Sequence, residues 1–355
     1  MNLDEKTPLI GMTPDELRAA AAEAGLPKFA GGQIAQWLYE KRADSIEQMT
    51  NLSNVGVARL VVQYCVGLQE PTAKAVSADG TVKFLFPATE RALDVEAVYI
   101  PDGDRATLCV SSQAGCKMAC EFCMTGKQGW HGNLTAAEIL NQVLSVDAMA
   151  MRGELPNRLT NIVFMGMGEP LDNLPAVMRA IDVLTAKWGL AWSPKRITVS
   201  TIGKLRELKQ LIEGTKAHIA ISVHSAMPQL RQKLMPAEKA YPVRDVMRLL
   251  RNYDFAHQRR LSVEYIMWRG VNDSLRHAEA LAKLIEGTSA RVNIIPFHAI
   301  PGVEMEPASM ADMEAFRDRL NDLGVTATIR ASRGQDIMAA CGMLAGKSKN
   351  SNKQL

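Results

Sequence analysis

Residues 109–130 read CVSSQAGCKMACEFCMTGKQGW, and three cysteines in this stretch determine the fold that we expect. Cys116, Cys120 and Cys123 follow the spacing C-x3-C-x2-C. Glycines in the same stretch give the backbone the freedom to bring the three thiols toward one point. Converging thiolates of this kind are typical of a metal or cluster site rather than of a protein core.

The spacing also bears on which metal group the loop would bind. A tetrahedral zinc site requires a fourth protein ligand, and the nearest candidates, Cys109 and His131, do not lie at a familiar zinc-ligand spacing from the triplet. An iron–sulfur cluster bound by three cysteines leaves one iron free to hold a cofactor. The pattern therefore favours a cluster over zinc and over structural thiols.

The C-x3-C-x2-C spacing resembles the signature of radical S-adenosylmethionine (SAM) enzymes. The longer segments RATLCVSSQAGC, CMTGKQGW and NLTAAEI are similar to the RlmN/Cfr family of adenosine methyltransferases, and closest to its RlmN branch. The resemblance extends roughly from Gly11 to Gly346 and rests on several separate motifs. It implies a [4Fe-4S] cluster on Cys116, Cys120 and Cys123, and two SAM molecules per turnover.

Composition limits the remaining possibilities. The chain has 355 residues with 47% hydrophobic content, which is enough for one large domain and a small accessory domain. Because the net charge is only +3, an RNA-binding surface must come from local clustering of the 41 Lys and Arg residues. We see no transmembrane segment and no signal peptide, and three of the six cysteines share one loop. We therefore expect a cytoplasmic protein with no membrane partner.

Local signals predict two units before the cysteine loop. Thr13 and Glu16 form a capping box that opens a small helical domain over residues 11–70, which the resemblance identifies as an RNA-binding accessory domain. Sequence alone leaves a plain packing role equally open. The dipeptide Asp79-Gly80 predicts a hairpin within a short β extension over residues 71–105.

Strands and helices then alternate through residues 106–346. Strands are expected over 106–112, 160–166, 195–201, 217–223, 261–267, 290–295 and 325–330. Helices are expected over 135–150, 174–187, 204–213, 243–253, 274–286 and 309–323. Repeated βα units with apolar strands predict a parallel sheet, and the fold class is α/β with a partial, open (β/α)6 radical SAM barrel. The polar tail over residues 347–355 is expected to be disordered.

Polar groups follow several predicted strands, at the end of the barrel where such folds place their sites. These are Gly168, Glu169, Ser200, Ser222, Val223, His224 and His298. Singly, each is more simply a hydrogen-bonding loop residue. The resemblance assigns them to SAM, with the Glu169 carboxylate on the ammonium group and Phe122 near the adenine. His298 departs from the Asn that many relatives have.

Three further residues are candidates for the chemistry itself. Taken alone, Glu96 is a polar residue in the apolar strand DVEAVYI, and Cys341 is a small hydrophobe in an Ala-rich segment. The similarity of RGQDI and AACG to the family's C-terminal motif implies that Cys341 carries a methyl group. The resemblance also makes Cys109 its resolving partner and Glu96 a proton acceptor.

The resemblance implies a reaction that needs both thiols. C2 of adenine is an electrophilic amidine carbon, so direct polar methyl transfer from SAM is unfavourable there. One SAM methylates Cys341, and a second yields a 5′-deoxyadenosyl radical that removes hydrogen from methyl-Cys341. The carbon radical joins adenine, Glu96 accepts the C2 proton, and Cys109 attacks the Cys341 sulfur. Product leaves as a disulfide forms.

The implied substrates are an adenosine of the 23S rRNA peptidyl transferase loop and the tRNA adenosine 3′ of the anticodon. A one-electron donor such as flavodoxin and a monomeric state are also expected. A Cfr-type enzyme that methylates C8 of the same rRNA adenosine is the alternative, and the GKQGW context favours C2. A zinc-stabilised RNA-binding protein without catalysis is the alternative from another class. Candidate phosphate contacts are Lys127, Lys195, Arg196, Arg259, Arg260, Arg330 and Arg333.

Overall fold

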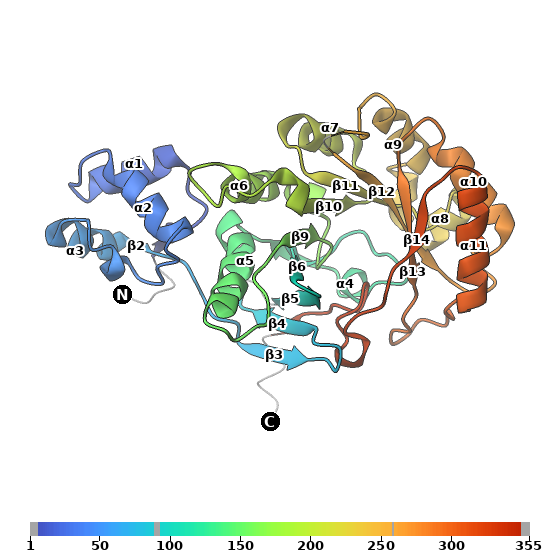
Figure 1. Ribbon diagram of the computed structural model, residues 1–355, viewed down its shortest axis with the longest axis horizontal. Helices are drawn as coiled ribbons and strands as arrows, with labels where there is room; N and C mark the ends of the chain where they lie inside the picture. The colour runs from blue at the N-terminus through green and yellow to red at the C-terminus, as the bar shows by residue number, and fades with distance from the viewer. Residues whose placement is uncertain (1–5, 89–92, 258, 349–355) are drawn as a thin grey trace.

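The computed structural model describes residues 6–88, 93–257 and 259–348 (Figure 1). A group of N-terminal helices lies to one side of a large sheet: α1 (Pro14–Glu23), α2 (Ala30–Tyr39) and α3 (Asn54–Gln63). The capping box predicted at the start of α1 is present, because Thr13 and Glu16 each accept a hydrogen bond from the other's backbone N–H. Strands β1 (Thr7–Pro8) and β2 (Tyr64–Cys65) pair in parallel and close this group.

The main sheet has the strand order β14-β13-β12-β11-β10-β9-β6-β5-β4-β3, and β15 pairs with β5. Its first three strands, in chain order, are β3 (Ala73–Val76), β4 (Val82–Phe86) and β5 (Leu93–Asp102). The barrel strands are β6 (Arg105–Cys109), β9 (Asn161–Phe164), β10 (Ile197–Thr201), β11 (His218–Ser222), β12 (Leu261–Met267), β13 (Arg291–Pro296) and β14 (Ala327–Ile329). Neighbouring strands from β6 to β14 are all parallel, which confirms the predicted open barrel.

The β extension continues this sheet. Strands β3 and β4 form the hairpin that Asp79-Gly80 predicts, with Gly80 in the left-handed region at φ +82°. Strand β5 then pairs antiparallel with β6, so the hairpin is attached edge-on to the first barrel strand.

Long helices cover the outer face of the barrel, in the order that the sequence predicts. They are α5 (Ala136–Met151), α6 (Leu174–Thr185), α7 (Leu205–Gly214), α9 (Val243–Leu250), α10 (Leu275–Ile285) and α11 (Met310–Asp322). The sequence did not predict two shorter helices, α4 (Met124–Lys127) and α8 (Pro228–Leu234). No helix within the described ranges is long and apolar enough to cross a membrane.

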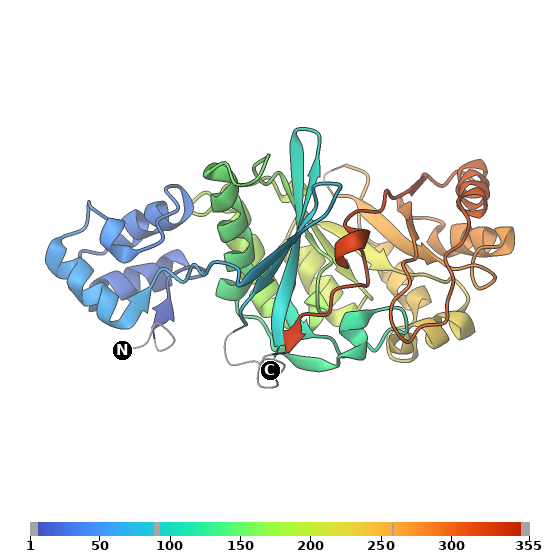
Figure 2. The ribbon, with the colours of Figure 1, turned by 90° about the horizontal axis from the view of Figure 1, so that it is seen from below.

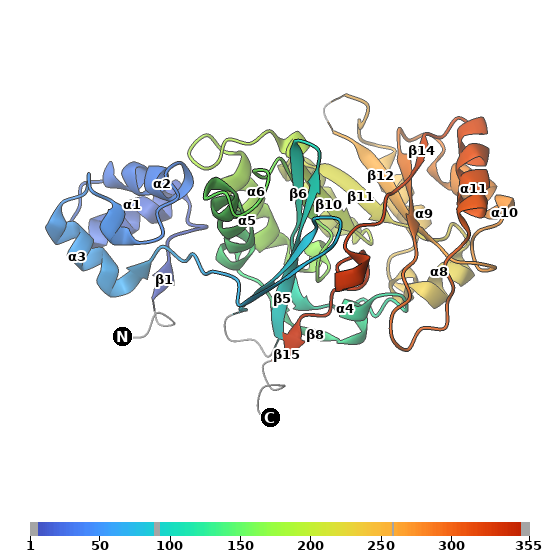
Figure 3. The same cartoon turned by 60° about the horizontal axis from the view of Figure 1, so that its bottom comes forward.

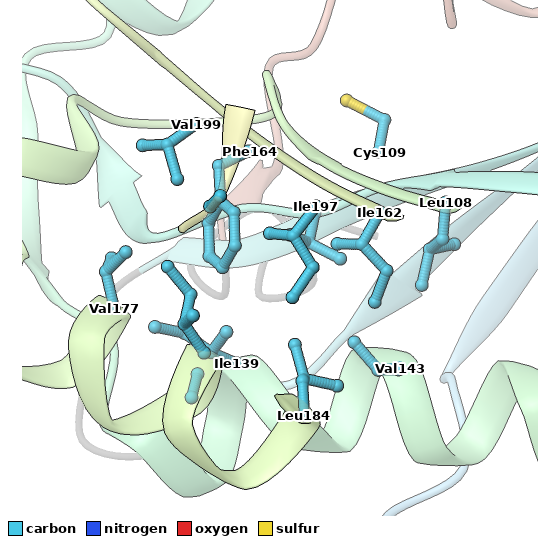
Figure 4. Close-up of a cluster of buried hydrophobic side chains, with 14 of the residues drawn as sticks. Leu108, Cys109, Ile139, Val143, Ile162, Phe164, Val177, Leu184, Ile197 and Val199 are labelled. Carbon is cyan, nitrogen blue, oxygen red and sulfur yellow. The ribbon is translucent and has the colours of Figure 1, made fainter. Parts of the chain in front are cut away.

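The core lies between the sheet and these helices. Figure 4 shows apolar side chains of α5 and α6 facing those of β6, β9 and β10. Leu108 points into this cluster, whereas Cys109, the next residue of β6, points away from it. Because side chains alternate along a strand, residues that flank the core positions face the interior of the barrel. This alternation directs Cys109 toward the inside.

The C-terminal segment returns across the barrel. Residues 331–348, which we call the strap, run from β14 past α4 to β5 (Figures 2 and 3). The strap contains a short 3-10 helix, η6 (Gln335–Ile337), then Cys341, and ends in β15 (Lys347–Ser348). The predicted disordered tail is therefore wrong for residues 347 and 348, which pair with β5, and residues 349–355 lie outside the described part.

Candidate active site

The cysteine loop is closed at its base by two short strands, β7 (Gln113–Gly115) and β8 (Trp130–Asn133). Gly115 has φ +74°, and a Cβ on it would lie 1.9 Å from the carbonyl oxygen of Gly129. Glycine is therefore required here for the two ends of the loop to meet. The N–H of Cys116 donates to that same carbonyl at 2.8 Å, which fixes the first cysteine at the mouth of the loop.

The three thiols of the loop lie near one another. Burial raises the pKa of Cys116 to about 12, with further contributions from Glu169 and Cys123. Burial also raises the pKa of Cys120, and the charges of Cys123 and Cys116 add to this effect. Within residues 6–88, 93–257 and 259–348, no three His, Cys, Asp or Glu side chains are arranged to hold a single metal ion. A four-iron cluster is larger than one ion, and a donor set of three thiols fits it.

An aromatic cluster packs against the loop. The Phe122 ring lies 4.8 Å from the His224 ring and 5.1 Å from the Trp268 ring, measured between centroids. Phe122 is buried in this cluster, which is the ordinary packing role for the residue before the third cysteine. Burial lowers the pKa of His224 to about 3, so the imidazole is neutral, and its Nδ1 accepts the N–H of Ile266 at 3.0 Å. Of the ring nitrogens, Nε2 is left for a ligand.

A buried arginine holds the end of β11, where three of the predicted SAM residues lie. Arg231 donates through Nε to the carbonyl of Val223 at 3.0 Å and through a terminal nitrogen to the carbonyl of Ser222 at 2.8 Å. Its remaining nitrogen pairs with Glu238, and both side chains are almost fully buried. Glu238 also accepts the N–H of Val243 at 3.0 Å. This network sets the backbone of the strand end, and no local sequence pattern indicates it.

Glu169 is buried at the end of β9. Its carboxylate accepts hydrogen bonds from the Thr201 hydroxyl, the Ile202 N–H and the Leu171 N–H. Burial nevertheless raises the pKa of Glu169 to about 7, and these three hydrogen bonds offset only part of that effect. An ionised carboxylate offers about four acceptor positions, so one remains for a cation.

The glycines beside Glu169 serve the protein's own packing. A Cβ on Gly168, at φ +99°, would lie 2.5 Å from the Cβ of Gln113, and one on Gly166 would lie 2.7 Å from the Ser111 hydroxyl. These glycines therefore let this segment approach Ser111 and Gln113, which lie just before the cluster cysteines. Gln113 reinforces this contact, because its side-chain oxygen accepts the N–H of Glu169 at 2.8 Å.

Polar side chains line the inside of the barrel. Ser200 and Ser222 alternate with core residues along β10 and β11, and Ser222 lies opposite Glu264 of β12. Glu264 is buried, with Oε1 accepting from Ser262 and Asn293 at 2.8 Å each. Its Oε2 is also buried and has no hydrogen-bond partner among the described residues. The sequence contained a signal for Glu264 in the apolar strand LSVEYIM, the same signal that identified Glu96.

Glu96 lies where β5 meets the strap. Its Oε1 forms an ion pair with Lys83 of β4 at 2.9 Å. Its Oε2 accepts the N–H of Ala345 in the strap at 3.0 Å. The carboxylate is therefore held between the hairpin and the segment that carries Cys341. The sequence pattern singles out Glu96, whereas nothing in it singles out Lys83.

Further contacts fasten the strap at both ends. Near its start, Asp336 accepts hydrogen bonds from the Ser77 hydroxyl at 2.6 Å and the Ala78 N–H at 3.1 Å, both in the β3–β4 hairpin. Beyond Cys341, the N–H of Met124 donates to the carbonyl of Gly342 at 2.8 Å, and the Thr125 hydroxyl donates to that of Leu344 at 2.6 Å. Cys341 is thus tied to the helix that immediately follows the cluster cysteines.

The strap brings Cys341 to Cys109. Burial raises the pKa of Cys109, and the charge of Cys341 is the next largest cause. Cys341 as a residue is exposed to solvent, but neighbouring protein atoms partly remove water from its thiol and raise the thiol pKa. The guanidinium of Arg330 opposes this rise. Arg330 lowers the pKa of Cys109 as well. Cys109 and Cys341 are far apart in the sequence, yet the Arg330 guanidinium lies close enough to both thiols to lower the pKa of each.

His298 follows β13 and is buried. One ring nitrogen, Nε2, hydrogen-bonds to the hydroxyl of Ser332 in the strap, and burial lowers the pKa of the imidazole. The side chain at this position therefore contacts the strap as well as the rim of the barrel.

Three of the candidate phosphate contacts have partners within the protein. The prediction is wrong for Arg259, which is buried and donates to the carbonyls of Ile212 and Thr215. Lys127 lies 3.7 Å from Glu121, so part of its charge is balanced. Arg196 lies over the ring of Trp192.

Comparison with known proteins agrees with this geometry. Residues 110–284 match the family model of the radical SAM superfamily, and residues 7–66 match that of the ribosomal RNA large subunit methyltransferase N-terminal domain. The chain is 54% identical over 351 residues to a probable dual-specificity RNA methyltransferase RlmN of Bacteroides fragilis, covering 98% of this chain and 99% of that one. It is 41% identical over 358 residues to the dual-specificity RNA methyltransferase RlmN of Jannaschia sp., covering 97% and 91%.

Structural comparison gives the same result. A radical SAM methyltransferase from Sphaerobacter thermophilus superimposes with a TM-score of 0.90 at 36% identity, covering 96% of this chain and all of that one. These matches support a [4Fe-4S] cluster and SAM as the cofactors, and they favour an enzyme over the zinc-stabilised, non-catalytic alternative. The chain belongs to the RlmN family of radical SAM RNA methyltransferases.

Proposed function

We propose that this protein methylates C2 of an adenosine in the peptidyl transferase loop of 23S rRNA and of the adenosine 3′ of the tRNA anticodon. The observation that carries the proposal is that the strap brings Cys341 close to Cys109, while contacts with Glu96 and with the helix after the cysteine loop hold the strap in place. Relatives that are 41–54% identical over nearly the whole chain carry the dual-specificity name.

The cofactors would lie along the barrel rim. Cys116, Cys120 and Cys123 would hold the [4Fe-4S] cluster, leaving one iron without a protein ligand. When bound, the cluster and SAM supply one electron and a carbon-centred radical. The residues expected to bind SAM are Gly168, Glu169, Ser200, Ser222, Val223, His224 and His298. The partly filled hydrogen-bonding capacity of the Glu169 carboxylate supports its role with the SAM ammonium.

The chain's own residues would perform the remaining steps. Methylation of Cys341 by SAM requires its thiolate, which Arg330 stabilises. After the methyl carbon of Cys341 is linked to adenine, Glu96 accepts the proton from C2. Before the next step, the unpaired electron of the adduct must leave to an electron acceptor. The Cys109 thiolate then attacks the Cys341 sulfur and the disulfide forms. The sulfur–carbon bond breaks with its electron pair left on the carbon, which takes up a proton to become the methyl group of the product. The adenine must be unstacked to reach this site, at a cost of a few kcal/mol.

We assign the parts of the chain accordingly. Residues 11–70 form an RNA-binding accessory domain, 71–105 a β extension, 106–346 the catalytic barrel with Cys341, and 347–355 the tail. We place the reaction in the cytoplasm, with a flavodoxin-like electron donor and a monomeric enzyme, because an oxygen-sensitive cluster suits a reducing compartment.

Product analysis tests the proposal. Anaerobically reconstituted protein is incubated with SAM, dithionite and an rRNA fragment, and the digested RNA is analysed by mass spectrometry. We expect 2-methyladenosine. Finding 8-methyladenosine would instead identify a Cfr-type enzyme, and finding 5′-deoxyadenosine without methylated RNA would show that the substrate is different.

A further inference from the structure

A groove on the outside of the barrel has an unusual concentration of positive charge. It has a volume of about 700 Å³ and is lined by residues 226–229 and by side chains of α9 and α10. Five of its lining residues are cationic and none is acidic: Arg244, Arg248, Arg251, Arg276 and Lys283. We call this the basic groove. The chain as a whole has a net charge of only +3, so the groove is a local feature.

Helical periodicity explains how the groove forms. On α9, Arg244 and Arg248 lie one turn apart, and Arg251, the residue that follows the helix, continues the same stripe. On α10, Arg276 and Lys283 lie two turns apart on one face, with Ala280 between them. The two helices lie side by side on the barrel (Figure 1), and the stripes line a common groove whose other lining residues are uncharged.

Most of this charge is not balanced by the protein. Arg248 pairs with Asp245 at 2.9 Å, but its side chain is 76% exposed, so the pair is weak. Arg251 donates to the carbonyls of Leu284 and Glu286, which joins α9 to the end of α10. The side chains of Arg244, Arg276 and Lys283 have no ion-pair or hydrogen-bond partner among the residues that the structure describes.

One part of the groove is formed by residues that follow β11, close in sequence to the candidate active site. Its lining begins at Ala226, two residues after His224, in the loop that leaves β11 at the barrel's active end. It then passes down the outer face between the two helices. An RNA strand that leaves the candidate active site beside β11 could therefore extend along the basic groove.

We propose that the basic groove binds the phosphodiester backbone of the RNA substrate, away from the nucleotide that is modified. The proposal rests on RNA being the substrate. Arginine guanidinium groups form paired, charge-assisted hydrogen bonds with phosphate oxygens. Phosphate contacts position a nucleic acid without reading its sequence. A site of this kind would serve both an rRNA and a tRNA, because phosphate contacts do not depend on the nucleotide sequence.

Two double variants, one in the groove and one outside it, test the proposal. Arg244→Gln/Arg276→Gln removes two unpaired groove cations, and Lys187→Gln/Arg206→Gln removes two exposed cations outside the groove as a matched control. We expect the groove variant to raise KM for RNA about tenfold at near-physiological salt with kcat unchanged, and to reduce the slope of log KM against log salt by about two. The control variant should stay close to the wild type. Arg244→Lys/Arg276→Lys, which keeps the charges but loses the paired hydrogen bonds, should keep the salt slope and lose only part of the affinity.

Direct RNA binding, measured by fluorescence anisotropy without turnover, separates this proposal from the proposed reaction. If the wild type binds RNA and the groove variant binds it more weakly, the groove proposal stands whatever product forms. Unchanged affinity and salt slope would overturn it. A variant that keeps RNA affinity and dithionite-driven activity but loses activity with an acidic protein donor would also overturn it, and would identify the groove as a donor-docking surface.

Discussion

The Nζ of Lys83 lies 2.9 Å from Oε1 of Glu96, and the same ammonium group donates to the carbonyl of Met338 at 3.2 Å. Glu96 in turn accepts the N–H of Ala345. Lys83 of β4 contacts the strap before Cys341 in the sequence, and Glu96 of β5 contacts it after Cys341. This arrangement couples the position of the proposed base to the position of the methyl-bearing thiol.

Replacing Lys83 should slow the late steps of the reaction selectively. Lys83→Met leaves the largely buried Glu96 carboxylate without its ion-pair partner and frees the Met338 carbonyl. We expect methylated RNA to form about 100-fold more slowly, at the low end of a general base contribution, while 5′-deoxyadenosine formation and Cys341 methylation continue. Quantifying both products, together with trapped protein–RNA adduct, checks this. Lys83→Arg should restore much of the rate, and equal loss of all steps would indicate a purely structural role.

SAM affinity should depend on pH through Glu169. Burial raises the pKa of Glu169 to about 7, so the carboxyl group is increasingly neutral below that pH and cannot pair with the SAM ammonium. We therefore expect affinity to increase as the pH rises from 6 to 8. Equilibrium dialysis with labelled SAM measures this. Glu169→Gln should bind weakly at every pH with a flat profile, and a sloping profile in that variant would assign the titration to another group.

Arg330 should control the reactivity of Cys341. Its guanidinium is the main influence opposing the raised pKa of the thiol, so Arg330→Gln should raise that pKa further. Alkylation of Cys341 by iodoacetamide, followed by peptide mass spectrometry across a pH series, should then require higher pH. Arg333→Gln is the matched control, because Arg333 does not contribute to the Cys341 shift. Superimposable profiles for Arg330→Gln and the wild type would contradict this role.

Arg231 should contribute strongly to stability. Arg231→Met leaves Glu238 buried without its partner, and we expect a loss of about 3–5 kcal/mol in the free energy of unfolding. Urea denaturation measures this. Adding Glu238→Gln to Arg231→Met should recover part of the loss, since the unpaired charge is removed. A loss below about 1 kcal/mol for Arg231→Met would show that water satisfies Glu238.

Several parts of the fold and site could be predicted because their signals are local. The cysteine spacing, the Asp79-Gly80 hairpin and the capping box at Thr13 each depend on a few adjacent residues. The alternation of apolar strands and amphipathic helices extends this local information over the whole barrel. Glu96 was also visible, because a carboxylate in an apolar strand stands out.

The residues that sequence reasoning missed depend on long-range pairing. Lys83 looks like an ordinary charge in TVKFLF until β4 pairs with β5 and the strap crosses it. Arg231 lies in a polar segment that gives no indication of complete burial. Arg259 shows the reverse error, since a basic pair in the sequence suggested a surface and one member is buried. Sequence patterns report periodicity, and they do not report which distant carbonyl or carboxylate a side chain will meet.

The central claim is that Cys341 carries the methyl group to RNA and Cys109 releases the product. The most direct test compares Cys109→Ala with Cys341→Ala, each reconstituted with cluster, SAM, reductant and RNA. We predict that Cys109→Ala accumulates a covalent protein–RNA adduct attached at Cys341, and that Cys341→Ala forms neither adduct nor methylated RNA. Methylated RNA produced by Cys341→Ala would contradict the claim.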